Sequence, residues 1–150
     1  MSETIRLVTE STTAWRARLL ERVAGASDTE LVAGTADDWG LGQIAVHLLL
    51  IERGVAFIVM RLAKGEPPGR TGQPRPAAAS VTRDGIASLA RKAGDAVAQL
   101  RAEFPSAPDV VAVARHPFYG DLNAIGWLLT LPNHYSGHLS ALDRGTRSAL

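Results

Sequence analysis

The feature that most constrains the fold is a connection rich in proline and glycine, "AKGEPPGRTGQPRPAAA" at residues 63–79, which lies between two long helical patterns. Proline lacks a backbone donor and glycine favours turns, so neither flanking helix continues through this connection. A hairpin between neighbouring helices needs far fewer residues, whereas a crossover that runs the length of a bundle needs about this many. The two helices that it joins are therefore expected to run parallel.

Apolar residues recur every three or four positions in four separate segments, which predicts four amphipathic helices. Gly40 is an acceptable N-cap for the second helix, with Gln43 at the capping-box position, and Asp121 is a good N-cap for the fourth. The third helix is expected to stop before Pro105. The predicted helices cover residues 5–25, 41–63, 80–104 and 122–142.

The remaining chain offers little evidence of a sheet. The best strand candidate, "DVVAVARHPF" at residues 109–118, is short and isolated, and no stretch shows sustained alternation flanked by hairpin turn signals. We therefore predict an all-α fold, a four-helix bundle with a long crossover between helices 2 and 3. At 150 residues the chain suits one domain, residues 1–150, with room for one site.

Composition narrows the classes of function. Sixteen basic residues face 15 acidic ones, for a formal net charge of +1 without a basic block, which argues against a nucleic-acid partner. The chain has no cysteine, so disulfides, thiolate nucleophiles and cysteine-based metal sites are excluded. Any bound metal must take its ligands from His, Asp, Glu and water.

The N-terminal sequence "MSETIRLVTE" lacks the basic and apolar regions of a signal peptide. Polar and charged residues interrupt the long apolar run at residues 44–62, and a bilayer disfavours charges near the middle of a span. These residues are His47, Glu52, Arg53 and Arg61. We expect a buried helix, no membrane partner and a cytoplasmic protein.

Two of the four histidines lie four residues apart in "PNHYSGHL", residues 132–139. On a helix, His134 and His138 are separated by about 40° around the axis and about 6 Å along it, so both rings can reach one ion. His47 lies on the apolar stripe of the second helix and is the candidate third ligand. Three neutral imidazoles would leave coordination positions for water or substrate. The residues alone leave open the alternative of hydrogen-bonded core histidines.

Other polar residues near these positions have simpler interpretations. His116 precedes a proline outside the predicted helices and is assigned to a loop. Glu52 lies about 140° around the helix from His47, which makes it a poor fourth ligand. We expect the Glu52 carboxylate to pair with a surface base. The alternative is that it hydrogen-bonds to a metal ligand and orients that ligand.

The fourth predicted helix contains further candidates and one irregularity. Ser136 and His138 point in different directions and cannot form a hydrolase triad. Asn133 and Tyr135 flank the first ligand and are candidates for facing a substrate, although simple exposure explains them equally well. Pro132 removes the amide donor to the carbonyl of Leu128, which predicts a kink just before His134.

The pieces "DDWGLGQIAVHLLLIERG" (37–54) and "RHPFYGDLNAIGWLLTLPNHYSGHLSAL" (115–142) resemble the DinB-like metalloprotein superfamily, which also includes bacillithiol- and mycothiol-dependent enzymes. The first is similar to that family's entry to its second helix, and the second to its "HP…G" loop and terminal H-x-x-x-H. The resemblance implies a four-helix bundle, often a homodimer, with a divalent ion such as zinc or nickel on His47, His134 and His138.

The resemblance also implies a class of function. It suggests a metal-dependent hydrolase or a low-molecular-weight-thiol transferase in detoxification or stress response, acting on a small-molecule substrate. In the mycothiol-dependent isomerase branch the first residue of the terminal pair is Glu, where this chain has His134, so that activity is not implied. No general base accompanies the histidines, so the catalytic residues are unassigned. The alternative is a non-catalytic metal-binding protein.

Overall fold

The computed structural model describes residues 3–145 and contains the four long helices that the periodicity predicts. Four short elements lie in the connections between these helices. The long helices are α1 (Glu3–Gly25), α3 (Leu41–Ala63), α4 (Arg83–Glu103) and α5 (Ala124–Asp143). The short elements are α2 (Asp28–Val32), the 3₁₀ turn η1 (Ala78–Ser80), β1 (Ala114–His116) and β2 (Gly120–Leu122).

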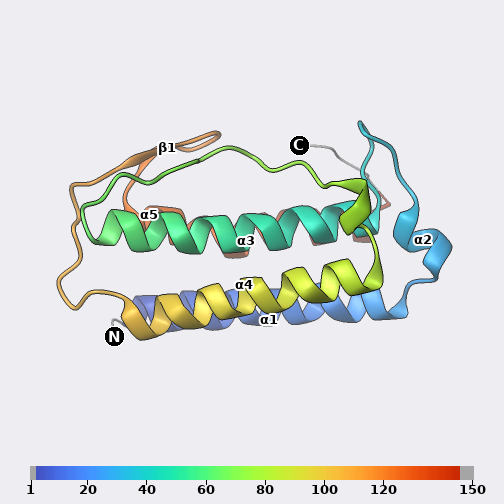
Figure 1. Ribbon diagram of the computed structural model, residues 1–150, viewed down its shortest axis with the longest axis horizontal. Coiled ribbons are helices and arrows are strands. Elements are labelled where there is room, and N and C mark those ends of the chain that lie inside the picture. Colours follow the sequence, from blue (N-terminus) through green and yellow to red (C-terminus); the bar gives the residue numbers. More distant parts are fainter. Residues whose placement is uncertain (1–2, 146–150) are drawn as a thin grey trace.

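The four long helices form a bundle in which α3 packs against α4 and α5, and α1 packs against the same two helices from the other side. The chain leaves the end of α3, returns along the whole bundle as an extended segment, and only then begins α4 (Figure 1). Helices α3 and α4 therefore run parallel, as the length of the connection predicts. The all-α fold with a long crossover is confirmed.

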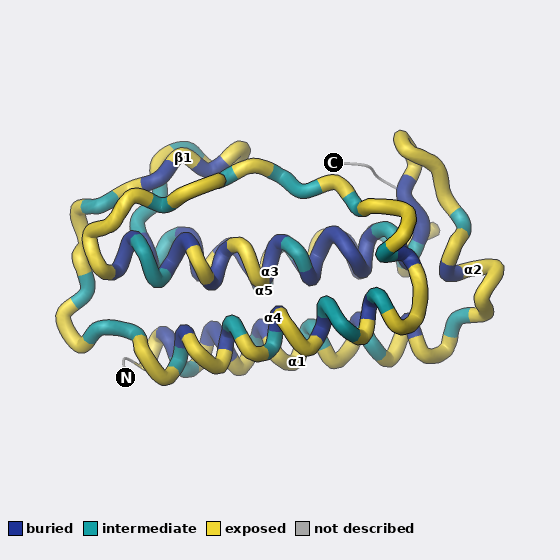
Figure 2. The backbone as a smooth tube through the Cα atoms, viewed as in Figure 1, coloured by how far each residue is buried: buried dark blue, intermediate teal, exposed yellow. Residues whose placement is uncertain are grey.

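Helix α3 is the central helix of the bundle, and most of its residues are buried (Figure 2). It is long and apolar enough to cross a membrane, with a mean hydropathy of 1.7, yet 61% of that window is buried inside the protein. A helix covered in this way is a core helix of the bundle, as the interrupting charged residues predict.

The start of α3 agrees with the sequence pattern. The backbone N–H of Gly40 donates to Oε1 of Gln43 at 3.0 Å, so the predicted capping partner is in place. A Cβ atom at Gly40 would lie 1.8 Å from the carbonyl oxygen of Ala33, so only glycine fits here. This contact fixes the entry of the helix that carries His47.

The start of α5 differs from the prediction. The N-cap is Asn123, whose side chain accepts a hydrogen bond from the N–H of Gly126, and not Asp121. Asp121 lies in β2, opposite Arg115 of β1. The strand pairing occupies the chain up to residue 122, so the helix can only begin after it.

The hairpin is the part of the fold that the prediction of an all-helical chain missed. Strands β1 and β2 pair antiparallel with His116 opposite Gly120, and Gly120 has a φ of 79° at the turn. The indole Nε1–H of Trp127 donates to the carbonyl of Ala114, which ties the hairpin to α5. His116, assigned to a loop from the sequence, is therefore the last residue of a strand.

Helix α2 was also missed, although its signal is visible in the sequence. Ser27 accepts from the N–H of Glu30, and the Glu30 carboxylate accepts from the N–H of Ser27. These two bonds form a capping box, which stabilises the start of even a short helix.

Candidate metal centre

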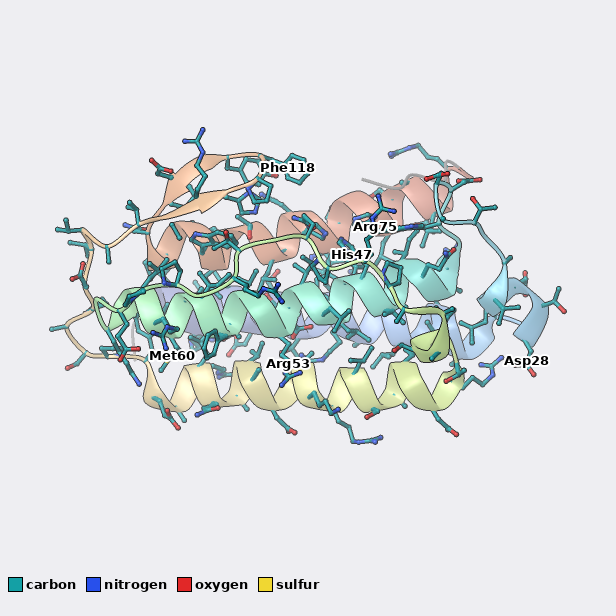
Figure 3. All side chains as sticks on the ribbon, turned by 45° about the horizontal axis from the view of Figure 1, so that its top comes forward. Asp28, His47, Arg53, Met60, Arg75 and Phe118 are labelled. Carbon is teal, nitrogen blue, oxygen red and sulfur yellow. The ribbon has the colours of Figure 1, made fainter. Side chains whose placement is uncertain are left out.

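The three predicted histidines meet between α3 and α5. His47 comes from the second turn of α3, and His134 and His138 lie one turn apart on α5. Each offers a ring nitrogen, and the three nitrogens lie within 4.8 Å of one another. Figure 3 shows His47 between its own helix, the crossover and α5.

The spacing of the rings suits one small ion. The Nε2 atoms of His47 and His134 are 3.0 Å apart, and the three pairs of ring centroids are separated by 5.1, 5.3 and 4.9 Å. Two nitrogens that bind zinc tetrahedrally, each at about 2.0–2.1 Å, lie roughly 3.3 Å apart. Small side-chain adjustments would therefore bring these rings to bonding distance.

The crossover sets the orientation of His47. Nδ1 of His47 lies 2.9 Å from the carbonyl oxygen of Pro74, and a carbonyl can only accept, so the ring proton is on Nδ1. Nε2 of His47 then carries a lone pair directed at Nε2 of His134. Either a proton on His134 or a cation must lie between the two nitrogens. A histidine held through its other nitrogen by a carbonyl is the usual arrangement of a metal ligand.

The environment keeps the three rings uncharged. Burial, with a smaller effect of the neighbouring histidines, lowers the pKa of His134 to about 3 and that of His138 to about 4. Burial also lowers the pKa of His47, against a smaller opposing effect of the Pro74 carbonyl. Neutral imidazole is the form that binds metals, so these rings are ready to bind at neutral pH.

Glu52 does not pair with a surface base, which corrects the expectation from the sequence. Its side chain is fully buried, one carboxylate oxygen accepts from Arg16 of α1, and the other accepts from the hydroxyl of Tyr135 at 2.5 Å. Tyr135 is 1% exposed and so does not face a substrate, while Asn133 is exposed. The network links α1, α3 and α5 beside the histidines.

His116 does not join the cluster of three nitrogens among the described residues, as expected. Its ring packs at 4.7 Å from the ring of Trp127, and its Nδ1 accepts from the N–H of Phe118 at 3.1 Å.

Helix α5 continues through Pro132, and the nitrogen of His134 still reaches the cluster.

A cavity of about 430 Å³ adjoins the cluster. Apolar residues of α3 form one wall and the crossover segment 70–74 another, while α5 and the hairpin close it with Trp127, Thr130, His134 and His116. His134 thus belongs both to the cluster and to the cavity wall. The helical spacing in the sequence predicts the three histidines. It gives no indication that the crossover contributes to the site.

Comparison with known proteins identifies the family. A sequence model of the DinB superfamily matches residues 11–142. The chain belongs to the DinB superfamily. The crystal structure of TT2238, a four-helix bundle protein, superimposes with a TM-score of 0.70 over 93% of this chain and 98% of that one, at 23% sequence identity. This similarity establishes the shared bundle fold. No curated protein matches the chain in sequence.

Proposed function

We propose that this DinB superfamily protein binds one divalent metal ion through His47, His134 and His138. The observation that carries the proposal is the convergence of three neutral ring nitrogens within 4.8 Å. Isolated buried imidazoles need polar partners, and here the described residues supply only the Pro74 carbonyl besides the rings themselves. Family membership supports the proposal, since metal binding is common in this superfamily.

A set of three nitrogen ligands favours particular metals. Imidazole suits zinc, nickel, copper and iron, whereas magnesium and calcium prefer oxygen ligands. No carboxylate joins the cluster among the described residues. We therefore propose zinc or nickel, as the resemblance implies.

We further propose that the protein is a metal-dependent enzyme, either a hydrolase or a low-molecular-weight-thiol transferase. A divalent ion would lower the pKa of a bound water molecule or thiol, and it would polarise a substrate. The protein itself supplies the fixed orientation of His47 through Pro74, and apolar walls that limit water around a small substrate. The cavity beside His134 supports an enzyme over a closed structural metal site.

Metal content is the first test. Protein purified without a histidine tag is expected to carry about one zinc or nickel per chain by elemental analysis. The double variant His134→Ala/His138→Ala is expected to carry none, and His116→Gln, which changes the histidine outside the cluster, is expected to keep the metal. Wild-type protein that lacks stoichiometric metal after growth with both metals would disprove the site.

Activity is the second test. Metal-loaded protein is assayed against small esters and amides, and separately against an electrophile with a low-molecular-weight thiol. Activity in either assay must disappear on chelation and return with the metal. Stoichiometric metal without activity in either assay would favour the alternative, a non-catalytic metal-binding protein. A cytoplasmic location, a single domain over residues 1–150, assembly as a homodimer and the absence of a nucleic-acid partner stay predictions from the sequence.

A further inference from the structure

The cavity beside the histidine cluster has a mixed lining that restricts what can bind there. Most of its surface is apolar, including Ile51, Val55 and Ile58 of α3 and the indole of Trp127. Of residues 3–145, no acidic side chain lines it, and the exposed Arg70 is the only lining residue with a fixed charge. Such a lining suits a mainly apolar molecule without a positive charge.

His116 places a free hydrogen-bond donor in this lining. The ring is 5% exposed, and burial lowers its pKa, which keeps it neutral. Because Nδ1 accepts from the N–H of Phe118, the ring proton is on Nε2. Nε2 has no partner among the described residues and is not one of the fully buried atoms, so it stays accessible. His116 reaches this position because the hairpin is tied to α5 through Trp127.

Gln73 contributes a second polar side chain to the cavity lining. It lies in the crossover and also lines the cavity. Its Oε1 is the one fully buried side-chain polar atom in residues 3–145 that has no hydrogen-bond partner. A buried acceptor without a partner is costly. If the Gln73 side chain rotates toward a ligand that donates a hydrogen bond, Oε1 gains a partner and this penalty is removed.

We propose that this cavity binds a small neutral carboxamide with an apolar, aromatic-sized body. The carbonyl oxygen of the amide accepts from Nε2–H of His116, and its N–H donates to Oε1 of Gln73 once that side chain has rotated toward the cavity. The proposal rests on the proposed function in one respect: a metal ion on His134 would stand at the cavity wall, beside the bound amide.

Three isosteric probes test the charge and hydrogen bonding of this site: benzamide, benzoate and benzamidinium. Binding is measured by protein-observed NMR, with both metal-loaded and chelator-treated protein. Benzamide is expected to bind at least tenfold more tightly than benzamidinium and more tightly than benzoate, and to shift the signals of Trp127, Thr130 and Gly72. Equal binding of all three probes, or shifts outside the cavity, would overturn the proposal.

Variants test the position of the ligand. Gly54 lines the cavity and a Cβ there meets nothing within 4 Å, so Gly54→Leu should fill the cavity without straining α3. It is expected to weaken benzamide binding at least tenfold. Gly25→Leu, at another glycine with open space around it but outside this cavity, is the matched control and should bind normally.

His116→Phe removes the donor and is expected to weaken benzamide binding roughly three- to tenfold. His116→Gln restores a donor near Nε2 and should recover part of the affinity. Unchanged binding in Gly54→Leu or in His116→Phe would overturn the proposal. Benzamide binding by a protein that holds no metal would disprove the metal site alone, whereas stoichiometric metal without benzamide binding would disprove the cavity proposal alone.

Discussion

Glu52 is a carboxylate that the protein buries completely beside the candidate metal centre. Burial raises its pKa, while the Tyr135 hydroxyl and the Arg16 guanidinium oppose that shift. A buried charge is tolerated only when its partners are well placed, and both oxygens are bonded here. Because Tyr135 lies between His134 and His138, its bond to Glu52 also fixes the rotation of α5 about its axis.

Removing the Tyr135 hydroxyl tests the contribution of this network. Tyr135→Phe keeps the ring but takes one donor from the buried carboxylate, which should lower the free energy of unfolding by about 1–3 kcal/mol. Urea denaturation measures the change. The control Thr130→Val removes a hydroxyl that bonds only within its own helix, to the carbonyl of Trp127, and should cost less. A loss below about 0.5 kcal/mol for Tyr135→Phe would show that Arg16 alone holds Glu52.

Single residues differed in how far the sequence could predict them. His134 and His138 share a helix face because of their spacing, and His47 faces inward because of its apolar neighbours, so local periodicity places all three. The partners of Glu52 are 36 and 83 residues away along the chain. Periodicity carries no information on such pairings, which is why a surface pairing was expected.

At the level of elements, the start of α5 depends on the hairpin before it. Strands of three residues give no usable alternation, so the sequence shows Asp121 as a good cap with nothing to prevent a helix there. In the protein, residues 120–122 pair with β1, so the helix begins later and Asn123 is its N-cap. The missed hairpin and the misplaced cap are therefore one error, and the hairpin is also what brings His116 to the cavity.

Two alanine substitutions separate the observed cap from the predicted one. Asn123→Ala leaves the N–H of Gly126 without its partner and should lower the free energy of unfolding by about 1 kcal/mol, within a range of roughly 0.5–2. Asp121→Ala removes only an exposed contact with Arg115 and should change it by less than about 0.5 kcal/mol. Thermal or urea denaturation of both variants measures the difference. A larger effect at Asp121 would contradict the observed helix boundary.

At the scale of the whole molecule, the crossover does more than connect two parallel helices. Its length alone predicts the topology, because no short connection can return the chain to the other end of a bundle. Its contacts could not be predicted: the Pro74 carbonyl bonds to His47, and Gln73 lines the cavity. An extended segment without periodicity gives no indication of which of its groups face inward.

The buried histidines make the stability of the whole metal-free protein depend on pH. In the unfolded chain a histidine has a pKa near 6.5, whereas in the folded protein the pKa falls to about 3 for His134 and about 4 for His138. Between these values the unfolded chain binds protons that the folded protein does not, so the free energy of unfolding decreases as the pH falls from about 6.5 toward 4. The raised pKa of Glu52 acts in the opposite direction and reduces this slope in part.

Urea denaturation of chelator-treated protein between pH 7.5 and 4.5 measures this slope. Each histidine contributes at most about 1.4 kcal/mol per pH unit, so we expect a loss of about 1–2 kcal/mol per unit below pH 6. The variant His134→Gln/His138→Gln removes two of the titrating groups and should show a distinctly shallower slope. Equal slopes in the wild type and the variant would mean that other groups cause the loss of stability. Wild-type stability that stays level or rises toward pH 4.5 would show that His134 and His138 are protonated as readily in the folded protein as in the unfolded chain. A shallower slope in the variant would instead show that the folded bundle keeps His134 and His138 uncharged. The uncharged imidazole is the form that can bind a metal ion.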